Sequence, residues 1–255
     1  FHKHLLCVNT ANKAQTLSEA TNKMGYLSAA ICEAAARGAN VMISEAVCGF
    51  DIEKTTKFAQ YILKEHKPNL LNMTYYCTDD LSQKFGPESG ETLLTLKYVD
   101  SCIESLRECL KELDILEESL FIVTADHGIT SVSKLLPDET ILKSIKELAV
   151  KPIFNDRTTH FHYEKEEKIE NELVRRLSAL DGVEHLFTKP ELILLGSNVP
   201  QIGRSVLTMN EDYCRQLVEK GTHGGYTEVE VNIPLILSGS GINKSSKIKF
   251  AKIID

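Results

Sequence analysis

A carboxylate and an imidazole stand next to each other in Asp126-His127, directly after an apolar run and directly before Gly128. The run, residues 121–125, is rich in β-branched and aromatic side chains, which predicts a buried strand. Asp126 and His127 would then lie at the carboxyl end of that strand, where open parallel sheets bind ligands, and the glycine would allow a sharp turn. On these residues alone, two interpretations stay open: a metal site and a hydrogen-bonded turn.

Two further stretches carry side chains of the same kind. Asp79 and Asp80 follow the apolar residues 70–76, which predict a second strand. His223 lies in a glycine-rich turn shortly before the apolar residues 233–237. Because a helix is predicted between the first two strands, they would form a βαβ unit with both acidic loops at one edge of the sheet.

Three stretches together resemble the alkaline phosphatase superfamily: the strand end at Asp126-His127-Gly128, the Asp79 loop that ends in Gly86-Pro87, and the late Thr222-His223-Gly224-Gly225 turn. The similarity runs from about residue 15 to the C-terminus and is most specific to two branches, the type I phosphodiesterases/nucleotide pyrophosphatases and the phosphonoacetate hydrolases. It implies an α/β three-layer sandwich with a mostly parallel central sheet and a smaller α+β insertion. Residues 1–130 and 221–255 would form the core, and residues 131–220 an inserted cap or substrate region.

The resemblance also implies a chemistry. In this superfamily two divalent ions, usually zinc, lie about 4 Å apart and bind the attacking and leaving oxygens of a phosphate ester. A threonine is phosphorylated in the first step, and water then hydrolyses the phosphothreonine. By motif, Asp79 and His223 correspond to ligands of one ion, and Asp126 and His127 to ligands of the other. Carboxylates and neutral imidazoles suit zinc, with manganese as the alternative.

The function implied is therefore metal-dependent hydrolysis of phosphate esters, of the phosphodiesterase or nucleotide pyrophosphatase type. An alternative is phosphonoacetate hydrolysis, which cleaves a carbon–phosphorus bond. The segments that resemble that second branch are Cys77-Thr78-Asp79, Gly182-Val183-Glu184 and residues 222–228.

Two departures from the family pattern favour a third hypothesis, a binding protein with impaired catalysis. Ser82 and Gln83 stand where the family loop has glycine and histidine, and an amide oxygen is a poorer zinc ligand than imidazole. Gln83 and Asp80 are accordingly doubtful metal ligands. No nucleophile is identified, because neither Thr10 nor Thr16 lies in the setting that the family uses. We expect that the N-terminal strand and the nucleophile turn are missing from this sequence, the alternative being that this half of the site has been lost.

Other histidines and one arginine have weaker claims. His2 and His4 alternate near the chain start, and His160 and His162 would share one face of a strand. Each pair fits a metal or substrate site, although an ordinary half-exposed strand is the commoner explanation. Arg204, in a Gly-Arg turn, is a weak candidate for contacting an anion.

The composition of the chain limits the classes of molecule that it is expected to bind. The chain has 255 residues, of which 42% are hydrophobic, and a net charge of −7, which argues against broad binding to nucleic acids or anionic membranes. A small phosphate ester or phosphonate is the expected partner, and the formation of a homo-oligomer is left open.

The 7 cysteines form no CxxC pair, which favours free thiols in a reducing, cytoplasmic compartment. No transmembrane stretch is visible.

The elements that would position these residues follow from hydrophobic periodicity. A helix is expected over residues 16–25, with Leu17, Ala20 and Met24 on one stripe, and a strand over 27–31. A helix from residue 52 ends before Pro68, and a longer one over 91–113 carries a packing stripe from Leu96 to Leu113. The insertion is expected to hold strands at 158–163, 183–195 and 205–209 and a helix at 166–180.

Overall fold

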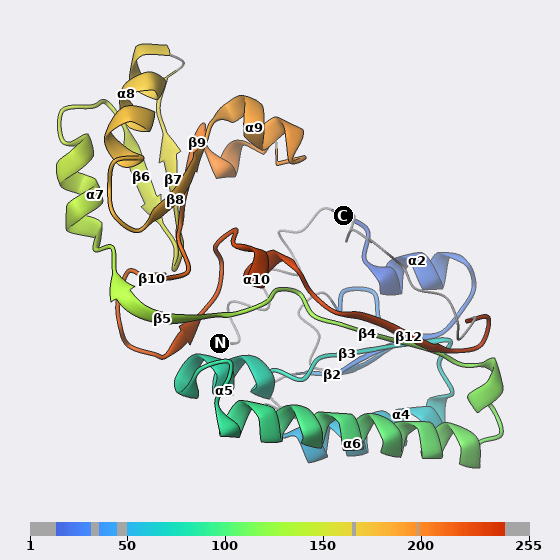
Figure 1. The fold of residues 1–255 in the computed structure, drawn as a ribbon. Coiled ribbons are helices and arrows are strands. Elements are labelled where there is room, and N and C mark those ends of the chain that lie inside the picture. Colours follow the sequence, from blue (N-terminus) through green and yellow to red (C-terminus); the bar gives the residue numbers. More distant parts are fainter. Residues whose placement is uncertain (1–13, 32–35, 45–49, 165–166, 198, 243–255) are drawn as a thin grey trace. The chain divides into compact units, whose positions relative to one another are not determined.

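The structure is a computed structural model that describes residues 14–31, 36–44, 50–164, 167–197 and 199–242 (Figure 1). The chain divides into two compact units. The first contains Phe1–Asp80, Leu93–Val123 and Leu235–Asp255, and the second contains Leu81–Thr92 and Thr124–Pro234. All of residues 131–220 belong to the second unit, and their assignment as an inserted cap or substrate region stays a prediction.

The first unit is built on a short parallel sheet. Its central strand β1 (Ser28–Ile31) pairs in parallel with β2 (Val41–Ile43) and with β3 (Leu70–Met73). Helix α2 (Leu17–Lys23) lies on one face of this sheet, and α4 (Ile52–His66) and α6 (Gly90–Glu112) lie on the other (Figure 1). β4 (Leu120–Thr124) pairs with β12 (Leu235–Gly239). The layers confirm the predicted α/β class, and all four residues of β1 are buried, as a strand covered on both faces requires.

The hydrophobic core of the first unit lies between the sheet and its two long helices. Its buried members are Ala29, Ile31, Ala59, Ile62, Leu63, Leu106, Cys109 and Leu110. The stripe predicted on α6 is only partly right, because Leu96 is 49% exposed. A helix of 23 residues spans about 34 Å, whereas a strand of four residues spans only about 13 Å, so the sheet cannot cover its whole length.

The stripe predicted on α2 is wrong. Leu17 and Met24 are exposed, and Ser18 is buried instead. Polar contacts orient this short helix: the Thr16 hydroxyl donates to the carbonyl oxygen of Arg37 at 2.6 Å. Thr16 is also the N-cap of α2, because its hydroxyl oxygen accepts the N–H of Glu19 at 3.1 Å.

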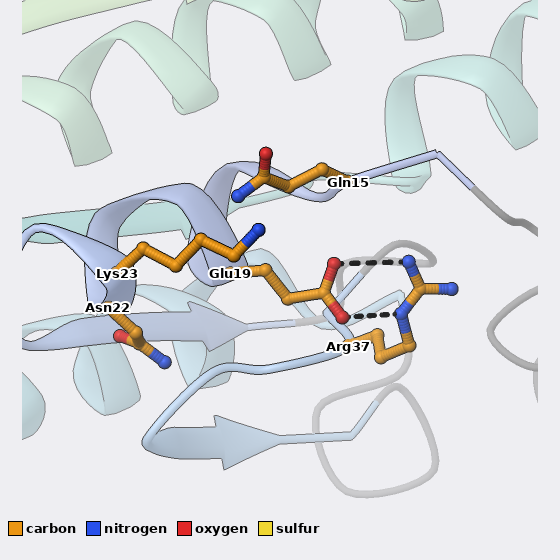
Figure 2. Close-up of a pocket in the computed structure, with 5 residues that line it drawn as sticks. All are labelled: Gln15, Glu19, Asn22, Lys23 and Arg37. Carbon is orange, nitrogen blue, oxygen red and sulfur yellow. Dashed lines mark hydrogen bonds and ion pairs between the residues drawn. The ribbon is translucent and has the colours of Figure 1, made fainter.

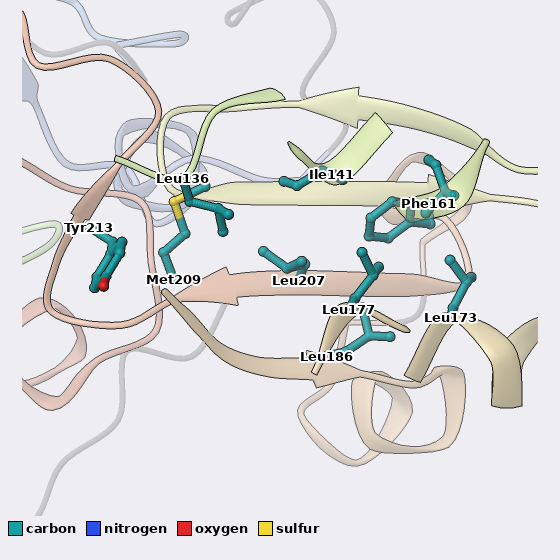
Figure 3. Close-up of a cluster of buried hydrophobic side chains, with 10 residues drawn as sticks. Leu136, Ile141, Phe161, Leu173, Leu177, Leu186, Leu207, Met209 and Tyr213 are labelled. Atoms are coloured by element: carbon teal, nitrogen blue, oxygen red, sulfur yellow. The ribbon is translucent and has the colours of Figure 1, made fainter. Parts of the chain in front are cut away.

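The second unit contains an antiparallel sheet in the order β6 (Lys151–Phe154), β7 (Thr158–His162), β9 (Ser205–Met209) and β8 (Val183–Phe187). The side chains of Leu136, Ile141, Phe161, Leu173, Leu177, Leu186, Leu207, Met209 and Tyr213 gather in its core (Figure 3). Two helices, α7 (Asp138–Ile145) and α8 (Glu167–Leu177), supply part of this core. A smaller sheet places β5 (Thr130–Leu135) between β10 (Asp212–Cys214) and β11 (Gly221–Thr222).

Two segments differ from the elements expected. The Asp79 loop is a helix, α5 (Cys77–Phe85). The strand expected at 183–195 ends at Phe187, and α9 (Lys189–Leu194) follows it. Glu191 accepts the backbone N–H of Thr188 at 2.7 Å, so a Thr-x-x-Glu capping box with a proline in its first turn starts this helix.

The cysteines that the structure describes are free and buried: Cys77, Cys102, Cys109 and Cys214. Burial raises the pKa of the Cys77 thiol to about 11, so this residue is an inert core side chain at neutral pH. Cys7, Cys32 and Cys48 lie outside the described residues. Among the described helices, none has the length and apolar character needed to cross a membrane.

Near the start of α2, five polar residues line an open pocket of about 590 Å³: Gln15, Glu19, Asn22, Lys23 and Arg37 (Figure 2). The carboxylate of Glu19 accepts two hydrogen bonds from the Arg37 guanidinium, at 2.8 and 3.1 Å, and one from the Thr16 N–H at 3.0 Å. The bonds from Arg37, and then that from Thr16, lower the pKa of Glu19 from its ordinary value of 4.5 to about 2.

Replacing Glu19 should therefore change how the first unit responds to acid. Because the pKa of Glu19 is depressed in the folded chain, its contribution to stability is fully present above pH 4.5 and is lost as the pH falls toward 2. In Glu19→Gln, hydrogen exchange of the β1 amides should lose the part of its pH dependence that falls in this window. Glu53→Gln is the control, since that carboxylate forms an exposed ion pair with Lys57. An unchanged acid response in Glu19→Gln would contradict this role.

Candidate metal centre

His127 lies in the turn between β4 and β5, and its ring is held in one tautomer. Its Nδ1 is 2.9 Å from the carbonyl oxygen of Gly128. Because a carbonyl only accepts, the proton is on Nδ1 and the lone pair of Nε2 is available to a metal. A hydrogen bond of this kind on the far ring nitrogen is the usual support of a metal-bound histidine.

The Asp126 carboxylate lies near the Nε2 edge of the His127 ring. Its Oδ2 lies 3.6 Å from His127 Nε2, and its side chain is 90% exposed. Both atoms can offer a lone pair to a cation when the proton is on Nδ1. Two ligand atoms on one tetrahedral zinc ion lie about 3.4 Å apart, close to the separation observed. The donor set thus fits a divalent ion.

His223 lies against His127. The two imidazole rings are stacked, with centroids 3.8 Å apart and planes 17° from parallel. One ring nitrogen of each histidine lies within 4.8 Å of the other, so both could contribute to a metal site.

A strand pairing explains why two histidines so distant in the sequence meet. β11, which ends one residue before His223, runs antiparallel to β5, which begins three residues after His127. Thr222 is paired with Thr130, and the Val132 N–H donates to the carbonyl oxygen of Lys220 at 3.0 Å. The pairing therefore brings the two turns to the same end of this small sheet.

Gly128 is required by a close approach of the backbone. Its N–H donates to the carbonyl oxygen of Glu230 at 2.7 Å. A Cβ at this position would lie 1.9 Å from the carbonyl oxygen of Val229, on the short helix α10 (Glu228–Val231). No other side chain fits here without moving α10 or the His127 turn.

Helix α5 carries the remaining predicted ligands. Gln83 lies in the second unit. Its backbone carbonyl oxygen accepts the N–H of Lys220 at 2.8 Å, and Lys220 is three residues before His223. Asp79 and Asp80 lie in the first turn of α5 and belong to the first unit. Asp79 and Gln83 are four residues apart, so they lie on one face of the helix.

The weaker candidates lie on other elements. His160 and His162 share the partly exposed face of β7, as predicted, and His160 Nδ1 is 3.1 Å from the carbonyl oxygen of Ile202. Burial, together with the nearby His162, lowers the pKa of His160. The Arg204 guanidinium lies 5.6 Å from the centre of the Tyr163 ring. His2, His4 and Thr10 lie outside the described residues.

Two residues that support the histidine turns escaped sequence analysis, Glu230 and Arg157. Thr227-x-x-Glu230 has the form of a capping box, which could have identified Glu230 as a residue with a structural role. Arg157 carries no comparable local signal, because its partner Glu230 is 73 residues away in the sequence.

Residues 15–193 match the family model described as type I phosphodiesterase / nucleotide pyrophosphatase. The chain belongs to this family. It is 32% identical over 74 residues to the ectonucleotide pyrophosphatase/phosphodiesterase family member 7 of Rattus norvegicus, and to that of Mus musculus. Each match covers 29% of this chain and only 17% of the relative, so the chain spans a minor part of these proteins.

Solved structures show the same fold. Murine ectonucleotide pyrophosphatase / phosphodiesterase 5 superimposes with a TM-score of 0.68 at 17% identity, over 88% of this chain and 63% of that one. The phosphonoacetate hydrolase of Sinorhizobium meliloti, in complex with phosphonoformate, gives a TM-score of 0.67 at 17% identity, over 91% of this chain and 70% of that one. The predicted alkaline phosphatase-like fold is thus confirmed.

Gly128→Ala should destabilise the second unit. The added methyl group would overlap the Val229 carbonyl, and overpacking of this kind costs about 1–3 kcal/mol. The free energy of unfolding, measured with denaturant, should fall by that amount. Gly90→Ala is the matched control, because a Cβ at Gly90 meets nothing within 4 Å. Equal stability of the two variants would contradict the close approach at Gly128.

Proposed function

We propose that this chain contains the metal-binding part of a hydrolase that acts on phosphate esters, of the phosphodiesterase or nucleotide pyrophosphatase type. The observation that carries the proposal is the stack of His127 and His223 beside the Asp126 carboxylate. Membership of the type I phosphodiesterase / nucleotide pyrophosphatase family supports it.

In this proposal two divalent ions share the site, with zinc favoured over manganese. By the motif correspondence, Asp126 and His127 would hold one ion, and Asp79 and His223 would hold the other. Gln83 and Asp80 stay doubtful ligands.

Bound divalent ions would supply electrostatic stabilisation of the charge that develops on the phosphoryl oxygens. The side chains of this chain supply orientation. The bond from His127 Nδ1 to Gly128 directs Nε2 toward the ion site, and the exposed Asp126 carboxylate lies on the side open to solvent. The nucleophile is left unassigned.

The substrate in this proposal is a small phosphate ester. In support, one solved relative of the same fold, an inactive variant of murine ectonucleotide pyrophosphatase / phosphodiesterase 5, is described in complex with AMP. A phosphonate is the second candidate, because the fold matches the phosphonoacetate hydrolase over more of both chains. A binding role without turnover is the third, supported by Gln83 and by the unidentified nucleophile.

Removing ligands from the site should lower the amount of bound metal and abolish turnover. In Asp126→Asn and in His223→Ala, we expect the zinc content by elemental analysis to fall and the hydrolysis of a chromogenic phosphodiester to disappear. His160→Ala is the matched control, because that histidine lies on β7 and bonds a backbone carbonyl. Full activity of His223→Ala would refute the site. Phosphate release from phosphonoacetate alone would favour the second candidate, and zinc binding without turnover of either compound the third.

Gln83→His should tighten zinc binding if position 83 faces the ion, because an imidazole nitrogen binds zinc better than an amide oxygen. Calorimetric titration with zinc would measure the dissociation constant, with Lys84→His on the same helix as the control. An affinity that does not change in Gln83→His would remove this residue from the site.

A further inference from the structure

A charged pair is fully buried in the second unit. The side chains of Arg157 and Glu230 are 0% and 2% exposed, and Arg157 Nε lies 2.7 Å from Glu230 Oε1. Charges are rarely buried to this extent unless every polar atom finds a partner.

The guanidinium of Arg157 bonds Glu230 and the backbone of two strands. Its Nη1 donates to the carbonyl oxygen of Tyr213 in β10. Its Nη2 donates to the carbonyl oxygen of Met209 at 2.9 Å, at the end of β9, and to Glu230 Oε2 at 3.1 Å. A planar fork of donors with fixed geometry can serve these acceptors at once, which a lysine cannot do.

Glu230 bonds both histidine turns. Its carboxylate accepts the N–H of Gly225 at 2.8 Å, two residues after His223, and the hydroxyl of Thr227 at 2.7 Å. Its backbone carbonyl accepts the N–H of Gly128, one residue after His127. One residue thus fixes the backbone beside each of the two stacked rings.

The fit at the His223 turn leaves no spare room. A Cβ on Gly225 would fall 2.5 Å from Glu230 Oε2 and 2.8 Å from Arg157 Nε. The backbone of this turn therefore rests directly on the ion pair, and a shift of the carboxylate would move the turn.

We propose that the buried Arg157–Glu230 pair positions the imidazoles of His127 and His223 for metal binding. This inference rests on the proposed function, because it takes the two histidines to be metal ligands. A carboxylate suits this task because it only accepts, and here it accepts from Arg157, Gly225 and Thr227 together. The amide group of a glutamine would direct two N–H donors at some of these same donors. Bonds to a charged acceptor are also shorter and stronger than neutral ones.

A purely structural role would also make Glu230 important, so the test needs a readout beyond stability. Each stacked ring shifts the proton resonances of the other upfield, and the histidine Cε1–H and Cδ2–H signals report this without any metal. The test compares these histidine signals in Glu230→Gln and in Leu207→Ala, a core substitution in the same unit. Both variants are measured under conditions where circular dichroism shows that they are folded. Thr227→Val, which removes one donor to the carboxylate and keeps the ion pair, replaces Glu230→Gln if the latter does not fold.

The expected result is that Glu230→Gln, and to a smaller degree Thr227→Val, lose the upfield shifts of His127 and His223 and bind zinc about 10–100-fold more weakly, as substitutions behind metal ligands do. Leu207→Ala should keep both properties. Unchanged shifts and zinc affinity in the Glu230 and Thr227 variants would overturn the proposal and leave the pair a structural role. If the unaltered chain binds no zinc but the shifts still depend on Glu230, the proposed function fails and the positioning role stands.

Discussion

The second unit depends on one constraint: a guanidinium and a carboxylate can stay buried only while each is surrounded by hydrogen-bond partners. Arg157 and Glu230 meet it by bonding backbone groups of β9, β10 and the turn that follows His223. The backbone carbonyl of Glu230 also accepts the N–H of Gly128, one residue after His127. Segments far apart in the sequence are thereby held at fixed distances. The stacking of the two imidazoles is a local consequence of this arrangement, completed by the pairing of β5 with β11.

The parts of the fold and site that sequence predicts are those with a local signal. The apolar run before Asp126 is the strand β4, although the burial predicted for it is wrong, because Ile122 is 61% exposed. The apolar residues 52–62 lie in α4, and the alternating residues 158–162 form β7. The resemblance to the family singled out Asp126, His127 and His223, and the structure stacks the two histidine rings. Their role as metal ligands stays a prediction. These successes rest on strand periodicity and on motif spacing, which are properties of neighbouring residues.

The errors have a common cause, which is that periodicity cannot say how far a partner surface extends. Leu17, Met24 and Leu96 follow a helical stripe, yet they lie where polar contacts or the limits of a short sheet leave them exposed. The sequence predicts a loop at Asp79, whereas the structure has the helix α5 there, with Asp79 and Gln83 four residues apart on it. Glu230 has the local pattern of a capping box but Arg157 has none, and only the packing reveals that the two form a buried pair.

The central claim is that histidines from two distant turns bind a divalent metal. X-ray absorption at the zinc edge, recorded on the zinc-loaded chain, tests it most directly because it reports the atoms around the ion. We predict nitrogen and oxygen ligands at about 2.0–2.1 Å with the multiple-scattering pattern of coordinated imidazole, and a weaker imidazole pattern in His223→Ala. A shell of oxygen atoms alone, without imidazole scattering, would contradict the account.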